Sequence, residues 1–242
     1  MRHWVGLVWF SLGAGPMVFS QTTFQEQTAR LQNINAYLLD FRPGAAPETV
    51  VRSRFELVLD INPQPTIDAR VGIKDEPLDP PSTVPKIRGR YLHRSGLALG
   101  AAYAPGIELD GYDADFYSLE LGYRFQVRAL NFGIRASYSD GDVTGPITEA
   151  NAEDYFVFEN KGLDFSLGHR IGRYHVYGFA GIVDIETSVD VASDGVHLEN
   201  ADDTYYGGLG VSIQYRRTTF NIEQNATDDY LQHLIFSLSY RF

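Results

Sequence analysis

The sequence of 242 residues predicts an all-β chain that folds into an antiparallel up-and-down transmembrane β-barrel. Three observations predict it. Apolar and polar residues alternate with period two in several segments. The connections between these segments alternate between short and long. The long connections are acidic and the short ones are basic. The 15 Tyr and 15 Phe also favour strands.

Period-two alternation is clearest in residues 234–242, LIFSLSYRF, where the apolar face carries Leu234, Phe236, Leu238, Tyr240 and Phe242. The same pattern occurs in 117–125, 130–138, 205–215 and 218–225. An apolar row facing lipid and a polar row facing the lumen are typical of membrane barrels. A soluble β-sandwich also alternates, with its apolar row inward, so a secreted binding protein is an alternative.

The connections form two sets. The looser set, residues 106–115, 140–161, 187–203 and 226–229, is rich in Asp and Glu, whereas the tight set, residues 93–96, 126–129, 169–173 and 216–217, carries Arg and His. Membrane barrels have short turns on the periplasmic side and longer loops outside. We therefore expect an acidic outer end and a basic periplasmic end.

The strand count depends on the N-terminal third. Residues 30–41, 53–61, 66–74, 86–92 and 97–105 are expected strands, and the Pro-rich segment 75–85 is expected to be a loop. The total is then about twelve. The alternative takes 86–105 as one strand, leaves 21–49 outside the barrel and gives ten.

The first twenty residues have the pattern of a secretory signal peptide. Arg2 and His3 precede the apolar run Trp4–Ala14. The segment Val18–Ser20 then offers small enough residues at the two positions that determine cleavage. The run is shorter than the roughly 20 residues that a spanning helix needs. The expected organisation is a signal peptide, 1–20, and one barrel domain, 21–242.

With its final aromatic strand, LIFSLSYRF, the sequence resembles the Gram-negative outer-membrane β-barrel superfamily, although no specific family within it. The resemblance implies location in the cell outer membrane, with outer-membrane lipid and lipopolysaccharide as surroundings. It also implies that the barrel-assembly machinery recognises Leu234, Phe236, Leu238, Tyr240 and Phe242 as an insertion signal.

Few residues suggest catalysis. The absence of Cys excludes disulfides and zinc–thiolate sites, and 31 acidic against 20 basic residues argues against nucleic acid as a partner. His93-Arg94-Ser95 has the spacing of a base and a nucleophile, but we expect a polar turn. We expect His233 to be a lumen residue and Asp110–Asp115 to be a solvated loop. No cofactor or metal is predicted; a lipid-modifying enzyme, such as a lipid hydrolase, is the alternative.

The lumen row carries charges of both signs. It comprises Arg54, Glu56, Asp60, Asp68, Arg70, Arg88, Arg90, Glu120, Arg124, Arg135, Asp164, Asp184, Glu186 and Glu223. These charges either line a porin-like, water-filled pore or pair and fill the interior. The sequence thus predicts a non-enzymatic barrel, either a narrow pore or a structural surface protein. We expect Arg to be tolerated better at the lumen-facing Ser118 or Ser212 than at Leu121 or Ile213.

Overall fold

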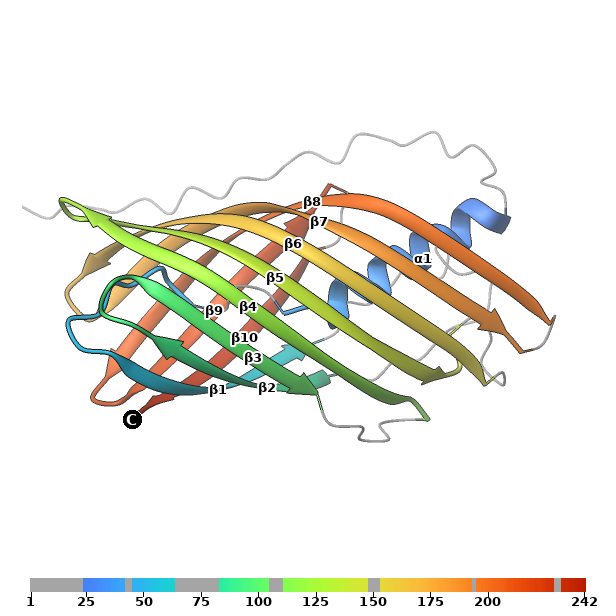
Figure 1. Ribbon diagram of the computed structural model, residues 1–242, viewed down its shortest axis with the longest axis horizontal. Helices are drawn as coiled ribbons and strands as arrows, with labels where there is room; N and C mark the ends of the chain where they lie inside the picture. Colours follow the sequence, from blue (N-terminus) through green and yellow to red (C-terminus); the bar gives the residue numbers. More distant parts are fainter. Residues whose placement is uncertain are drawn as a thin grey trace, which may run out of the picture.

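The computed structural model describes residues 24–41, 45–63, 83–104, 111–147, 153–192, 195–228 and 232–242. Within these ranges, ten strands form a closed antiparallel barrel, in which each strand pairs with its sequence neighbours and the first pairs with the last (Figure 1). The strands are β1 Arg54–Pro63, β2 Thr83–Leu92, β3 Leu97–Ala104, β4 Asp113–Val127, β5 Leu130–Gly145, β6 Asp154–Ile171, β7 Tyr174–Val191, β8 Val196–Tyr215, β9 Thr218–Thr227 and β10 Gln232–Arg241. The predicted closed antiparallel barrel is confirmed.

The count of twelve strands is wrong, and the reason lies near the N-terminus. Residues expected to form a first strand, 30–41, lie largely in the helix α1, Phe24–Leu39. The hairpin about His93–Gly96 is present between β2 and β3, so 86–105 is not one strand. The expected strand 66–74 and the expected signal peptide 1–20 lie outside the described residues.

Helix α1 lies inside the barrel. It enters at the end opposite the two-residue turns (Figure 1) and packs against the inner faces of β6, β7 and β8. Residues 45–50 then line the interior toward the end with the turns, where β1 begins. We call residues 24–41 and 45–50 the lumen segment. Within the described residues, no helix combines the length and hydropathy needed to span a membrane.

The outer face of the barrel carries a continuous apolar band. Leu119 and Leu121 of β4 are each 54% exposed, and their neighbours across the strands are also apolar. Aromatic side chains border the band on both sides. Tyr103, Tyr117, Tyr138 and Tyr205 lie toward the long connections, and Phe55, Tyr91, Tyr123, Tyr174, Tyr215, Tyr240 and Phe242 lie toward the short turns.

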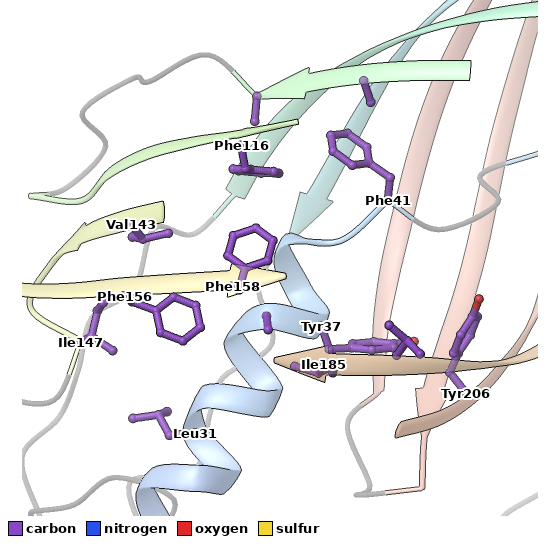
Figure 2. Packing of buried hydrophobic residues seen from close by; sticks show 14 of the residues in the cluster. Leu31, Tyr37, Phe41, Phe116, Val143, Ile147, Phe156, Phe158, Ile185 and Tyr206 are labelled. Carbon is purple, nitrogen blue, oxygen red and sulfur yellow. The ribbon is translucent and has the colours of Figure 1, made fainter. Parts of the chain in front are cut away.

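Beyond this band, β4 to β8 continue as a raised sheet, which we define as residues 113–116, 139–145, 154–161, 183–191 and 196–204. Here the polarity of the two faces is exchanged. Val183, Ile185 and Val189 of β7 are buried on the inner face, whereas Asp184, Glu186 and Asp190 lie on the outer face. The helix covers the inner face, so apolar residues belong there (Figure 2).

The raised sheet corrects two predictions. Much of the expected loops 140–161 and 187–203 is strand, because their apolar residues pack on α1 rather than remaining in solvent. Asp184 and Glu186 were predicted to face the lumen but lie on the outer face, where the Glu186 side chain is 56% exposed. The prediction assumed that the apolar row faces outward along the whole strand.

Candidate functional site

The interior of the barrel holds a network of ion pairs. Arg88 of β2 binds Asp60 of β1 and lies 3.0 Å from a Glu120 carboxylate oxygen of β4. Arg135 of β5 links the same Glu120, at 3.3 Å, to Asp164 of β6, at 2.7 Å. Alternate residues along each strand point inward, so charges on β1, β2, β4, β5 and β6 are joined inside the lumen. Buried guanidinium groups require such carboxylate partners.

The lumen segment is bonded to this interior at the end of α1. Lys86, which is only 1% exposed, donates from its Nζ to the carbonyl oxygens of Leu38, Leu39 and Asp40 at 2.8–2.9 Å. The last carbonyls of a helix have no partner within it and carry partial negative charge. The ammonium group therefore caps the helix C-terminus inside the barrel.

Aromatic side chains fill the space between the helix and the raised sheet. Phe41 lies 5.7 Å from Phe116 and Tyr37 lies 5.9 Å from Tyr206, measured between ring centroids (Figure 2). Phe116 in turn contacts Phe158. Gly210 leaves room for the Tyr177 ring, because a Cβ atom there would lie 2.3 Å from a ring carbon. The helix is thus packed as part of the core.

Glu48 holds the lumen segment at the opposite end of the barrel. Its carboxylate oxygens lie 3.1 Å from Arg54 of β1 and 3.2 Å from Arg170 of β6, and 3.5 Å from Arg241 of β10. Arg54 and Arg241 are on the paired strands β1 and β10, whereas Arg170 is on β6, so one carboxylate connects the segment to three strands.

Among the described residues, a cavity lies at each of two places between these groups. The cavities offer about 30 Å³ and about 40 Å³ to water-sized spheres, which is room for a few water molecules each. The first lies beside Glu120 and Asp164, and the second lies beside Glu48 near the short turns. The described residues therefore fill most of the interior around them.

Most of the predicted lumen residues lie inside the barrel. The interior set comprises Arg54, Glu56, Asp60, Arg88, Arg90, Glu120, Arg124, Arg135, Asp164 and Glu223. Asp184 and Glu186 lie outside, as described above, and Asp68 and Arg70 lie outside the described residues. Sequence reasoning missed Glu48 and Lys86, because it did not expect an internal helix that would bring partners to them.

The other candidates are dispersed. His93 and Ser95 are hydrogen-bonded, with Nδ1 2.8 Å from Oγ, but both are at an exposed turn. His233 is buried beside the Tyr37 ring. Asp113 and Asp115 are on β4, and Asp110 lies outside the described residues. In the described part of the chain, no three His, Asp or Glu side chains are grouped as a metal site would require.

A further group, missed by sequence reasoning, is in the raised sheet outside the apolar band. His197 of β8 places its Nδ1 2.6 Å from Asp190 and its Nε2 3.4 Å from Glu199. The hydrogen bonds that the ring of His197 donates to these carboxylates raise its pKa above the ordinary 6.5. Sequence reasoning could not find this pair, because it depends on the cross-strand register that places Asp190 of β7 opposite His197 of β8.

The His197 group gives a pH-dependent prediction. Since the pKa in the folded protein is raised, the attraction is fully present below about pH 6.5 and is lost as the pH rises through the raised value. Asp190→Asn is expected to lower the pKa of His197 in an NMR titration. The control Ser188→Ala, on the same face of β7, should leave the titration unchanged. An unaltered pKa in Asp190→Asn would contradict the pairing.

The architecture defines the class of the protein. A closed antiparallel barrel with an outer apolar band between two aromatic borders is the architecture of Gram-negative outer-membrane β-barrels. The protein is an outer-membrane β-barrel, as the sequence predicted. By the general rule that short turns lie on the periplasmic side, we expect the short turns to face the periplasm and the raised sheet to face outward.

No protein-family model matches the sequence, and no curated protein matches it. Solved structures of similar fold include the outer-membrane protease OmpT of Escherichia coli, with a TM-score of 0.41 and 9% identity over 78% of this chain and 96% of that one. The translocator domain of the autotransporter NalP from Neisseria meningitidis has a TM-score of 0.39 and 11% identity over 90% and 95%. A loop-deletion mutant of a different protein, OmpT of Vibrio cholerae, which is an outer membrane protein, has a TM-score of 0.35 and 13% identity. The match covers 66% of this chain and 54% of that chain. This chain thus spans about half the length of the Vibrio protein.

Proposed function

We propose that the protein is a non-enzymatic outer-membrane barrel whose lumen is kept closed by its own N-terminal segment, so that it serves as a structural surface protein rather than as an open pore. The observation that carries this proposal is the lumen segment, which is bonded to the barrel wall at successive levels. Its outward surface is the acidic outer face of the raised sheet.

The contacts of the lumen segment extend along its whole length. Toward the outer end, Asn33 donates to Asp202 at 2.9 Å. In the middle, Asn160 donates to the carbonyl oxygen of Ala36 at 2.9 Å, and Ser139 donates to the carboxylate of Asp40 at 2.5 Å. The Phe41 carbonyl accepts from Arg135 at 2.9 Å. Because these partners lie on different strands, removal of the segment would break many contacts at once.

A narrow pore is the second candidate, and the charged interior is what favours it. A barrel of ten strands lies between those of about eight strands, which side chains fill, and the large porins, which conduct. The ion pairs, however, consume the charges that would otherwise attract permeating ions. Arg88, for example, is 1% exposed and engaged by two carboxylates. We therefore favour a closed lumen.

An enzymatic role is disfavoured by the geometry of the best candidate pair. A serine nucleophile needs an imidazole base that a third group orients. Among the described residues, His93 has Ser95 as its side-chain hydrogen-bond partner and a ring contact with Tyr91, and no carboxylate is bonded to it. The pair also lies in the β2–β3 turn, away from the occupied lumen.

The decisive experiment is single-channel recording in planar lipid bilayers. We expect the intact barrel to show no steady conductance and a variant lacking residues 24–50 to show stable conducting steps. A heat-modifiable gel shift would establish that the variant is folded. Glu48→Gln provides a second variant that keeps the segment, and brief openings are expected there because its carboxylate no longer pairs with the arginines. The matched control is Glu26→Gln, an exposed position on α1. Equal, steady conductance of the intact and shortened barrels would contradict the proposal.

A further inference from the structure

Arginines gather around the cavity near the periplasmic turns. Six of its lining residues are arginines, Arg54, Arg90, Arg124, Arg170, Arg173 and Arg241, whereas two are acidic, Glu48 and Glu56. The excess is four positive charges. Ser212, Gln214, Thr219 and Ser239 also line the cavity and supply hydroxyl and amide groups. Such an arrangement is suited to an anion.

The two carboxylates are already used by other arginines. Glu48 pairs with Arg54, Arg170 and Arg241. Glu56 pairs with Arg54 at 2.8 Å and with Arg90 at 3.1 Å. Each carboxylate is thus shared among several guanidinium groups, and the positive charge in the cavity remains in excess.

Two of the lining arginines, Arg124 of β4 and Arg173, form no ion pair with a described residue, and Arg173 donates to the Tyr174 hydroxyl at 3.1 Å. Arg124 is therefore the one without such a donor contact. Its guanidinium makes no hydrogen bond or ion pair to a described residue, although it lines both cavities of the lumen. The carboxylates whose field reaches it are Glu56 and Glu120. Glu120 is itself engaged by Arg88 and Arg135. A partly buried guanidinium in this position calls for an anion.

We propose that this cavity is a binding site for a phosphate group, with Arg124 as the residue that binds it. A guanidinium presents parallel N–H donors that match two phosphate oxygens, and neighbouring arginines compensate a charge of one or two. The phosphate comes either from a free periplasmic anion or from the headgroup of an inner-leaflet phospholipid. Arg170, whose side chain is 51% exposed, lines the cavity at the end of the barrel with the short turns.

The site is tested with the full chain in nonionic detergent, titrated with inorganic phosphate at constant ionic strength against a chloride reference. We expect saturable binding by isothermal titration calorimetry, and Arg124→Gln should weaken it at least tenfold. The matched control is Arg128→Gln in the β4–β5 turn, outside the cavity, which should bind as the original does. No saturable binding, or equal binding by Arg124→Gln, would overturn the proposal.

Thermal stability gives an independent readout. Without phosphate, the midpoint of heat modification in Arg124→Gln should equal or exceed that of the original protein, because an uncompensated charge has been removed. With phosphate, the midpoint should rise only where Arg124 is present. A variant that is less stable without phosphate would show that Arg124 has a structural partner and would contradict the proposal.

A second titration distinguishes the two sources of phosphate. Short-chain phosphatidylglycerol is added to the phosphate-loaded barrel, and the bound phosphate is followed by ³¹P NMR. Displacement that depends on Arg124 would identify a lipid headgroup as the occupant, whereas retention of phosphate would identify a free anion. Both results support the site. Conductance plays no part in these measurements, so they stand apart from the test of the closed lumen.

Discussion

Replacing Lys86 with methionine is expected to free the lumen segment from the barrel wall and to lower the free energy of unfolding by about 3–5 kcal/mol. Methionine keeps much of the side-chain volume but cannot donate to the carbonyl oxygens of Leu38, Leu39 and Asp40. Each carbonyl would then be buried at a helix end without its charged donor. The ammonium also lies 5.0 Å from the centre of the Phe41 ring, and that attraction is lost as well.

Two measurements check the Lys86 prediction. Urea unfolding in lipid vesicles gives the loss of free energy, and added protease reports whether residues 24–41 leave the lumen. The control is Lys161→Met on the raised sheet, where the side chain is 49% exposed and pairs with Glu159 and Glu186. Exposed ion pairs contribute about 1 kcal/mol or less. Equal effects of the two substitutions would contradict the capping role of Lys86.

The sequence predicts the barrel well because one physical rule governs its outer face. Where a strand crosses lipid, each second residue must be apolar, and this rule is visible in 117–125 and in 234–242. The two-residue turns at Arg128 and Arg216 are also visible, since short connections between alternating segments leave little choice of pairing. These local patterns suffice to place ten interior charges of the predicted lumen row.

The lumen segment could not be placed in the same way. Residues 24–39 have Leu31, Ile34 and Leu38 at helical spacing, and Thr23 and Glu26 have the spacing of a capping box. Those signals favour a helix and were not weighed when 30–41 was expected to be a strand; they also do not reveal that the helix lies in a barrel. Its partners, such as Asn160 and Lys86, are distant in sequence and are brought together only by closure of the barrel.

Closure also changes the expectation for lumen substitutions. Ser118 and Ser212 were expected to accept arginine because their side chains would meet water or charge. Ser118 is fully buried, and Ser212 donates to Asn221 at 2.8 Å. Around Ser118 the interior is filled, so overpacking by an arginine is expected to cost about 1–3 kcal/mol or more. Ser212 lines the arginine-rich cavity, where an added arginine would lose the hydrogen bond to Asn221 and meet like charges. An arginine at either position should therefore not be better tolerated than at Leu121.

The exchange of polarity between the apolar band and the raised sheet predicts the other large effect. Ile185 is fully buried on the inner face, where it packs in the core beside α1 (Figure 2). Ile185→Arg is expected to destabilise the protein by at least about 3 kcal/mol, since it removes core packing and buries a charge. Leu121→Arg, on the outer face within the band, should cost about 2–4 kcal/mol because its side chain faces lipid.

The control for both is Ser188→Arg, on the outer face of the raised sheet, where the side chain meets water. Its expected effect is within about 0.5 kcal/mol. Unfolding in lipid vesicles gives the loss of free energy for all three variants. We expect the losses for Ile185→Arg and Leu121→Arg to be well above the loss for Ser188→Arg. Leu121 and Ser188 are both on the outer face. A large difference between the costs of their arginine variants would therefore place the edge of the membrane between the level of Leu121 and the level of Ser188. A cost at Ser188 as large as that at Leu121 would mean that lipid reaches the raised sheet, and tolerance of Ile185→Arg would mean that α1 does not cover its inner face.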